Sequence, residues 1–130
     1  MEKINEYKFR FTQEDVINFS NASGDKNPIH LDENYAKNTI FKKRILHGFL
    51  GASVFSKVFG TISPGAGTIY LNQSMYFYKP MFIHEDYKAI FITLNVDSEK
   101  HRALVKTEIR DSNNILIIDG EALIQHESIK

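Results

Sequence analysis

The stretch ILHGFLGASVFSKVF (residues 45–59) decides the fold of this chain, because it is apolar nearly all the way round a helix. A helix with apolar residues on every side is buried in a protein core. Small residues such as Gly48 and Gly51 lie in its first half, so backbone or a ligand can approach closely there. We therefore expect a central buried helix around which the rest of the chain is arranged.

Four strands are predicted after this helix. The run Ser-Pro-Gly-Ala-Gly at residues 63–67 is a strong break. Short apolar or alternating stretches follow it and predict strands at residues 68–77, 87–97, 103–111 and 115–125. The run Asp-Ser-Asn-Asn at residues 111–114 predicts a hairpin turn, and residues 96–102 predict another. The second half of the chain is therefore expected to form an antiparallel sheet.

A short strand and small helices are predicted before the central helix. Residues 3–11 favour a strand. Residues 13–22 favour an amphipathic helix, with Thr12 as its cap and Gly24 just beyond its end. Asp32 is expected to cap one or two further helical turns. This order predicts an α+β fold in which a sheet wraps round a central helix, as a single domain over residues 1–130.

Composition excludes several classes of function. The chain has 130 residues, 42% hydrophobic and 25% charged, and its formal net charge of zero offers no global footprint for nucleic acid. No apolar run approaches the roughly 18 residues of a membrane span, and the first residues lack the pattern of a secretion signal. We therefore expect a cytoplasmic protein that does not enter a membrane. The absence of cysteine excludes disulfides, thiolate zinc sites and cysteine nucleophiles.

The best candidate for chemistry is the segment DKNPIH (residues 25–30), which we expect to be too irregular for helix or strand. It sets the Asp25 carboxylate and the His30 imidazole around an Asn-Pro turn, within reach of one water molecule. The alternatives are that Asp25 is only a turn residue and that His30 is a hydrogen-bonded core histidine. From the residues alone, both interpretations stay open.

Three segments together resemble the signatures of a known family. GDKNPIHLD (24–32), HGFL (47–50) and PGAGTIYL (64–71) are similar, in this order, to segments of the MaoC-like hydratases, specifically the (R)-specific enoyl-CoA hydratases. The resemblance covers nearly the whole chain. It implies a hotdog fold, a homodimer, and hydration of trans-2-enoyl-CoA to (R)-3-hydroxyacyl-CoA with no cofactor and no metal.

The resemblance also implies roles for the residues of the turn. Asp25 and His30 would hold one water between them, with His30 removing its proton and Asp25 orienting it and helping to pass the proton to the α carbon. A single water held by both groups accounts for addition on one face of the substrate. Asn27 would hold the turn, and Pro28 would make it rigid.

Two residues of the central helix are further candidates. Gly48 lies at the predicted helix start, where free amide groups favour a developing oxyanion, although a glycine needed for close packing explains it too. Ser56 lies about two turns further on and resembles the family serine that hydrogen-bonds the catalytic aspartate. The alternative for Ser56 is a hydroxyl bonded back to the helix. For His47 we favour a structural or positioning role over that of a second base.

The substrate-binding residues are less well defined by the sequence. Phe49, Leu50, Val54 and the aromatic residues of the strands, such as Phe77, are candidate walls of an acyl pocket. Arg44, with Lys42 and Lys43, is a candidate contact for the phosphates of coenzyme A, although a surface charge run is more often only solvated. The histidines at positions 84, 101 and 126 are far apart, and no metal-ligand spacing emerges.

Three alternative functions remain on the same fold. The first is a dehydratase acting on 3-hydroxyacyl carrier protein or on a specialised acyl thioester. The second is a module that binds acyl thioesters without turning them over, which the joint presence of Asp25, His30, Gly48 and Ser56 argues against. A thioesterase is the least favoured, because hotdog thioesterases place their carboxylate differently.

Overall fold

The computed structural model describes residues 5–130 of the chain. In chain order, the elements are β1 (Glu6–Phe9), α1 (Gln13–Ser23), α2 (Pro28–Leu31), α3 (Glu33–Lys37), α4 (Gly48–Thr61), β2 (Ile69–Phe77), β3 (Tyr87–Asp97), β4 (Arg102–Asp111) and β5 (Leu116–Gln125). The predicted central helix and the predicted strands are present. Residues 3 and 4 of the predicted first strand lie outside the described residues.

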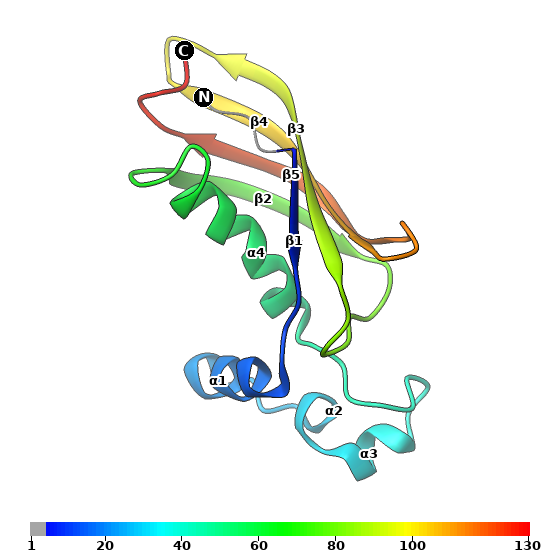
Figure 1. The fold of residues 1–130 in the computed structure, drawn as a ribbon. Helices are drawn as coiled ribbons and strands as arrows, with labels where there is room; N and C mark the ends of the chain where they lie inside the picture. The colour runs from blue at the N-terminus through cyan, green and yellow to red at the C-terminus, as the bar shows by residue number, and fades with distance from the viewer. Residues whose placement is uncertain (1–4) are drawn as a thin grey trace.

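The five strands form one antiparallel sheet in the order β1-β3-β4-β5-β2. Strands β3, β4 and β5 are joined by hairpins, whereas β2 crosses to the far edge and pairs with β5. Helix α4 lies along one face of this sheet, and α1, α2 and α3 gather at the end of the sheet where α4 begins (Figure 1). The small helices therefore stand next to the N-terminus of the central helix.

The hydrophobic core lies between α4 and the sheet. Phe55 and Val58 of α4 are each 1% exposed, and Phe55 meets Phe91 of β3 edge to face with ring centroids 5.9 Å apart. The prediction that α4 is buried on all sides is wrong for one face. Phe49 is 68% exposed, and Ser56 and Lys57 on the same side of the helix are exposed as well.

Helix α1 has strong signals at both ends. The Thr12 side chain accepts a hydrogen bond from the Asp15 amide, and the Asp15 carboxylate accepts one from the Thr12 amide, which is a capping box. Gly24 ends the helix in the left-handed region at φ 80°. These ends confirm the predicted cap and stop, and they fix the point at which the chain leaves α1 toward Asp25.

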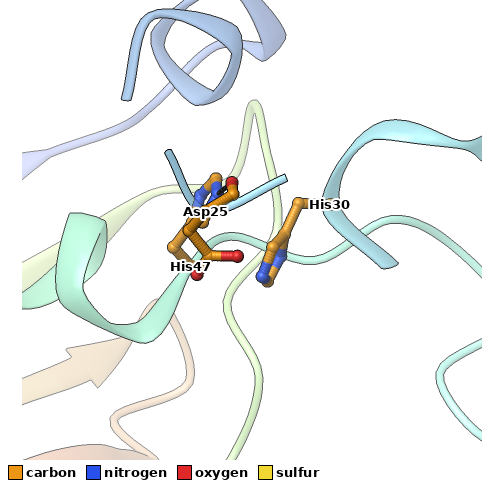
Figure 2. A group of neighbouring side chains, drawn as sticks. All are labelled: Asp25, His30 and His47. Atoms are coloured by element: carbon orange, nitrogen blue, oxygen red, sulfur yellow. Dashed lines mark hydrogen bonds between the residues drawn. The ribbon is translucent and has the colours of Figure 1, made fainter. Parts of the chain in front are cut away.

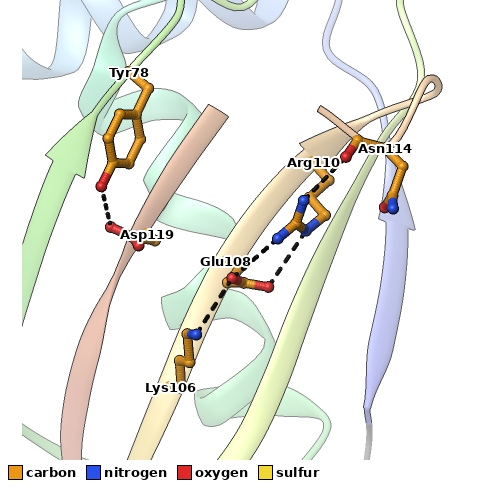
Figure 3. Close-up of polar contacts among 6 residues, drawn as sticks. All are labelled: Tyr78, Lys106, Glu108, Arg110, Asn114 and Asp119. Atoms are coloured by element: carbon orange, nitrogen blue, oxygen red, sulfur yellow. Dashed lines mark hydrogen bonds and ion pairs between the residues drawn. The ribbon is translucent and has the colours of Figure 1, made fainter. Parts of the chain in front are cut away.

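The face of the sheet away from α4 carries a polar network. Ile109 and Thr107 of β4 point into the core, so their neighbours Lys106, Glu108 and Arg110 point to the other face. Arg110 donates two hydrogen bonds to the Glu108 carboxylate, at 3.4 and 3.3 Å, and the Lys106 ammonium lies 3.7 Å from it (Figure 3). The negative charge of the mostly buried Glu108 is therefore matched by two cations.

Candidate active site

His30 is held by both its main chain and its ring. It lies in α2, a short helix that begins at Pro28 and is capped by the Asn27 side chain, which accepts a hydrogen bond from the Ile29 amide. The expectation that residues 25–30 are wholly irregular is therefore wrong, because the Asn-Pro pair starts a helical turn. The His30 Nδ1 lies 2.8 Å from the main-chain oxygen of Ile45.

The hydrogen bond to Ile45 sets the tautomer of His30. A carbonyl oxygen only accepts, so Nδ1 of His30 carries the proton and donates it. The neutral ring then has its lone pair on Nε2, where it can accept a proton from a bound molecule. The side chain is 7% exposed, and burial is the largest cause that lowers its pKa below the ordinary 6.5. His30 is therefore arranged as a neutral base near pH 7.

Asp25 lies in the loop between α1 and α2 and is exposed. Its Oδ1 accepts a hydrogen bond from the Asn27 amide at 3.2 Å, which fixes the carboxylate within the turn. Its own amide donates to Ser23 Oγ at 3.1 Å. The second carboxylate oxygen carries no protein hydrogen bond among the described residues, so it can accept one from a water or a substrate.

Asp25, His30 and His47 form one cluster, in which one potential ligand atom from each residue lies within 4.8 Å of the others (Figure 2). The rings of His30 and His47 are stacked, with centroids 3.9 Å apart and an interplanar angle of 30°. Two rings stacked so closely cannot both point a nitrogen at one ion about 2.1 Å away. The geometry suits proton transfer better than a shared metal ion.

Gly48 is the first residue of α4, and the helix N-terminus has no side-chain cap. The amides of the first turn lack intrahelical partners, as at every helix N-terminus, and the positive end of the helix dipole lies at Gly48, which lines the pocket described below. A side chain at position 48 would have its Cβ 2.8 Å from Cε1 of Phe77. Both interpretations of this glycine therefore fit its place, an exposed amide and a close packing contact.

A pocket of about 440 Å³ opens beside this cluster. Its walls include both histidines and Gly48, and the remainder is mostly apolar or aromatic: Phe41, Ile45, Leu46, Phe49, Phe77, Tyr78, Lys79, Pro80, Met81 and Ile118. An apolar pocket with a few polar groups at one point is the usual form of a small-molecule site. The cluster and the pocket together form the candidate active site.

Several predicted site residues lie elsewhere. Ser56 is exposed, about 12 Å along the helix axis from Gly48 at 1.5 Å per residue, and no hydrogen bond among the described residues joins it to Asp25. The expected Ser56–Asp25 contact is therefore absent within this chain. Leu50 belongs to the core instead of the pocket wall, and Arg44 lies 3.8 Å from Glu33. Of the predicted pocket walls, Phe49 and the strand aromatic Phe77 line the pocket, whereas Leu50 and Val54 do not.

Other residues of the site were missed from the sequence. Met81 and Lys79 line the pocket. Lys79 brings a positive charge to it, whereas the sequence predicted this role for Arg44. Two main-chain hydrogen bonds hold the segment before α4: the Ile45 amide donates to the Ile29 oxygen, and the Leu46 amide donates to the Met81 oxygen. Such contacts between distant segments have no local signal.

No helix among residues 5–130 is long and apolar enough to cross a membrane.

A five-stranded antiparallel sheet that holds one central helix is the hotdog fold, and here it carries an acid and a base at the start of that helix. Residues 2–114 match the family model described as MaoC like domain. The chain belongs to this MaoC-like family of hydratases and dehydratases. The expected family and fold are thereby confirmed.

Individual relatives agree with this assignment. The chain is 37% identical over 116 residues to an (R)-specific enoyl-CoA hydratase of Aeromonas caviae, covering 89% of this chain and 87% of the relative. It is 30% identical to a mitochondrial 3-hydroxyacyl-[acyl-carrier-protein] dehydratase of Arabidopsis thaliana, covering 86% and 68% of the two chains. The solved structure of an (R)-hydratase from A. caviae involved in PHA biosynthesis superposes with a TM-score of 0.89 at 34% identity, covering 95% and 96%.

Proposed function

We propose that this protein adds water reversibly to trans-2-enoyl-CoA to give (R)-3-hydroxyacyl-CoA. The observation that carries the proposal is the tautomer of His30, which leaves a basic Nε2 in a cluster with the Asp25 carboxylate, at the start of a helix and beside an apolar pocket. Hydration of a conjugated thioester needs these parts: a base for water, an acid for the α carbon and donors for the thioester oxygen.

In the proposed reaction, Nε2 of His30 takes one proton from a water that also donates to the free oxygen of Asp25. The water oxygen forms a bond to the β carbon, and the electron pair of the double bond moves toward the thioester carbonyl. The Gly48 amide stabilises the negative charge on that oxygen. The proton on Nε2 of His30 then passes through the Asp25 carboxylate to the α carbon, on the same face of the substrate. This step returns His30 to its neutral form and Asp25 to its carboxylate form.

The test is the rate of crotonyl-CoA hydration, which is measured as the loss of the enoyl absorbance. Asp25→Asn and His30→Ala are each expected to lower kcat/KM by roughly 100-fold or more, as removal of an acid or base does. Asp97→Asn is the matched control, because it changes an exposed aspartate at the far end of β3. Near-normal activity of either site variant contradicts the proposal, and so does an (S) product.

A carrier-protein substrate is the second candidate, favoured by the similarity to the Arabidopsis dehydratase. The two candidates share the chemistry and differ in what carries the acyl group. Rates measured on one acyl group, attached in turn to coenzyme A and to carrier protein, separate them. If the rate on the carrier-protein substrate is at least tenfold higher, which corresponds to about 1.4 kcal/mol, carrier protein takes the place of coenzyme A as the proposed acyl carrier.

We propose further that two copies of the chain associate through the β2 edge. Strand β2 is nine residues long, lies at the edge of the sheet and exposes Ile69, Leu71 and Phe77. Phe49, on the free side of α4, is exposed as well. Long apolar edges of this kind are normally covered. Sedimentation should give a dimer at micromolar concentration and a monomer for Leu71→Lys; a wild-type monomer contradicts the proposal.

A further inference from the structure

His47 lies at the centre of the site, although the proposed reaction gives it no proton to carry. It is 2% exposed. Its ring stacks on His30, with centroids 3.9 Å apart, and contacts the tilted ring of Phe19 in α1, with centroids 4.8 Å apart. Its Nε2 lies 3.0 Å from Ser20 Oγ and 3.1 Å from the main-chain oxygen of Asp25. One ring thus touches α1, the Asp25 loop and the base.

The contacts of His47 set its protonation. The Asp25 carbonyl only accepts, so Nε2 of His47 carries a proton and shares it between that carbonyl and the Ser20 hydroxyl. Its Nδ1 is buried and has no hydrogen-bond partner among the described residues. A proton on Nδ1 would therefore be a buried donor without an acceptor, which is costly. These contacts favour the tautomer that carries its proton on Nε2.

This form complements that of His30. His30 is protonated at Nδ1 and keeps its lone pair on Nε2, whereas His47 uses Nε2 as a donor. Because the rings are stacked, a charge on His47 would oppose the arrival of a proton on His30. A neutral His47 leaves His30 free to accept one.

We propose that His47 is a positioning residue, whose Nε2–H fixes the main chain at Asp25 while its ring face fixes the imidazole of His30. It thereby sets the distance between the acid and the base. This inference rests on the proposed hydration reaction for its kinetic consequence, but its hydrogen-bond pattern exists without the reaction. Small errors in such a distance have large effects, since a misplacement of about 1 Å can cost about 100-fold in rate.

Two amide variants separate the hydrogen bond from simple packing. The side-chain amide nitrogen of Gln stands as many bonds from Cα as the histidine Nε2, whereas that of Asn matches Nδ1 and is too short to reach the Asp25 carbonyl. Both variants lose the ring face, but only His47→Gln keeps the hydrogen bond. His47→Gln is therefore expected to lose clearly less kcat than His47→Asn, which should lose about 10- to 100-fold in kcat with little change in KM. Ser20→Ala, which leaves the Asp25 hydrogen bond in place, should stay closer to the wild type than His47→Asn.

The second measurement does not use activity. Imidazole ¹⁵N–¹H spectra of the wild-type protein should show His47 protonated at Nε2 and His30 at Nδ1 when both are neutral. A neutral His47 protonated at Nδ1 overturns the inference, whatever the variants do. Folded His47→Asn with wild-type kcat overturns it too, as does an equal loss in folded Gln and Asn variants. If the wild type does not hydrate crotonyl-CoA, the proposed function fails while the spectra still decide the hydrogen-bond pattern.

Discussion

The Nδ1–H of His30 donates to the main-chain oxygen of Ile45 across 2.8 Å, and this bond leaves Nε2 as the basic atom. Burial is the largest cause of the change in the pKa of His30, and it lowers that pKa below its ordinary value of 6.5. The base must be neutral to work, so activity is present above the His30 pKa and lost as pH falls through it. We expect kcat/KM to have an acidic limb with its midpoint below pH 6.5.

The pH profile on crotonyl-CoA provides the measurement. A midpoint clearly above 6.5 would show that His30 is stabilised in its charged form, against the effect of its burial. The residual activity of His30→Ala is the control, because its profile should lack that limb if His30 is the group that titrates.

Gly48 is predicted to be intolerant of a side chain because of one neighbour. The Cβ of Gly48→Ala would lie 2.8 Å from Cε1 of Phe77, so the ring or the start of α4 must move. Overpacking of this kind costs about 1–3 kcal/mol, and it should also lower kcat, because the amide of residue 48 moves with the helix. Denaturant unfolding and steady-state kinetics check both effects.

The double variant Gly48→Ala/Phe77→Ala separates the packing effect from other causes. Removing the ring frees the space, so alanine at position 48 should cost much less stability in the Phe77→Ala background than in the wild type. An equal cost in both backgrounds would show that the contact with Phe77 is not what selects glycine.

Gly24, which directly follows α1, and Gly60, which lies inside α4, provide a matched pair. Gly24 has φ 80°, which an alanine adopts at a cost of about 1–2 kcal/mol, and it directly precedes Asp25. Gly60 lies inside α4, and a Cβ added there would meet no atom within 4 Å, so alanine should raise the stability by about 0.5–1 kcal/mol. Thermal unfolding of both alanine variants checks the opposite signs, and only Gly24→Ala should also lower kcat.

Local signals in the sequence predict most elements well. Strand β3 spans residues 87–97, as its apolar pattern predicts, and β5 begins one residue after its predicted start. The Asp111 hairpin forms, with the Asp111 carboxylate accepting from the Asn113 amide. These features depend on residues near one another in the chain, where propensity and turn chemistry act directly.

Long-range features were beyond the sequence alone. The position of β2 beside β5 depends on the topology of the sheet, and no residue of β2 carries a local signal that predicts it. The exposed face of α4 was missed because apolarity on all sides of a helix does not say which of its faces the rest of the chain covers. Helix α2 had a signal in Asn27-Pro28, since an N-cap residue before proline starts helices.

The candidate site divides in the same way. The Asp25–His30 spacing pointed to the cluster because both lie on one short segment. The contact of Ser20 with His47 joins residues 27 positions apart and had no signal in either. The Ser56 prediction came from family resemblance, while the helical rise already placed that residue about two turns beyond Gly48.

The capping box of α1 should contribute to the stability of the site as well as to that of the helix. Thr12→Ala removes the acceptor of the Asp15 amide, and the loss of such a cap costs about 1 kcal/mol. Thr12→Ser keeps the acceptor and is the matched control. Helix α1 carries the Phe19 and Ser20 side chains that contact His47. Loss of the cap loosens only the first turn of α1, so it should lower the unfolding free energy more clearly than it lowers kcat. Chemical denaturation of both variants measures the cost, and equal stability of the alanine and serine proteins would show that the hydrogen bond of Thr12 does not matter.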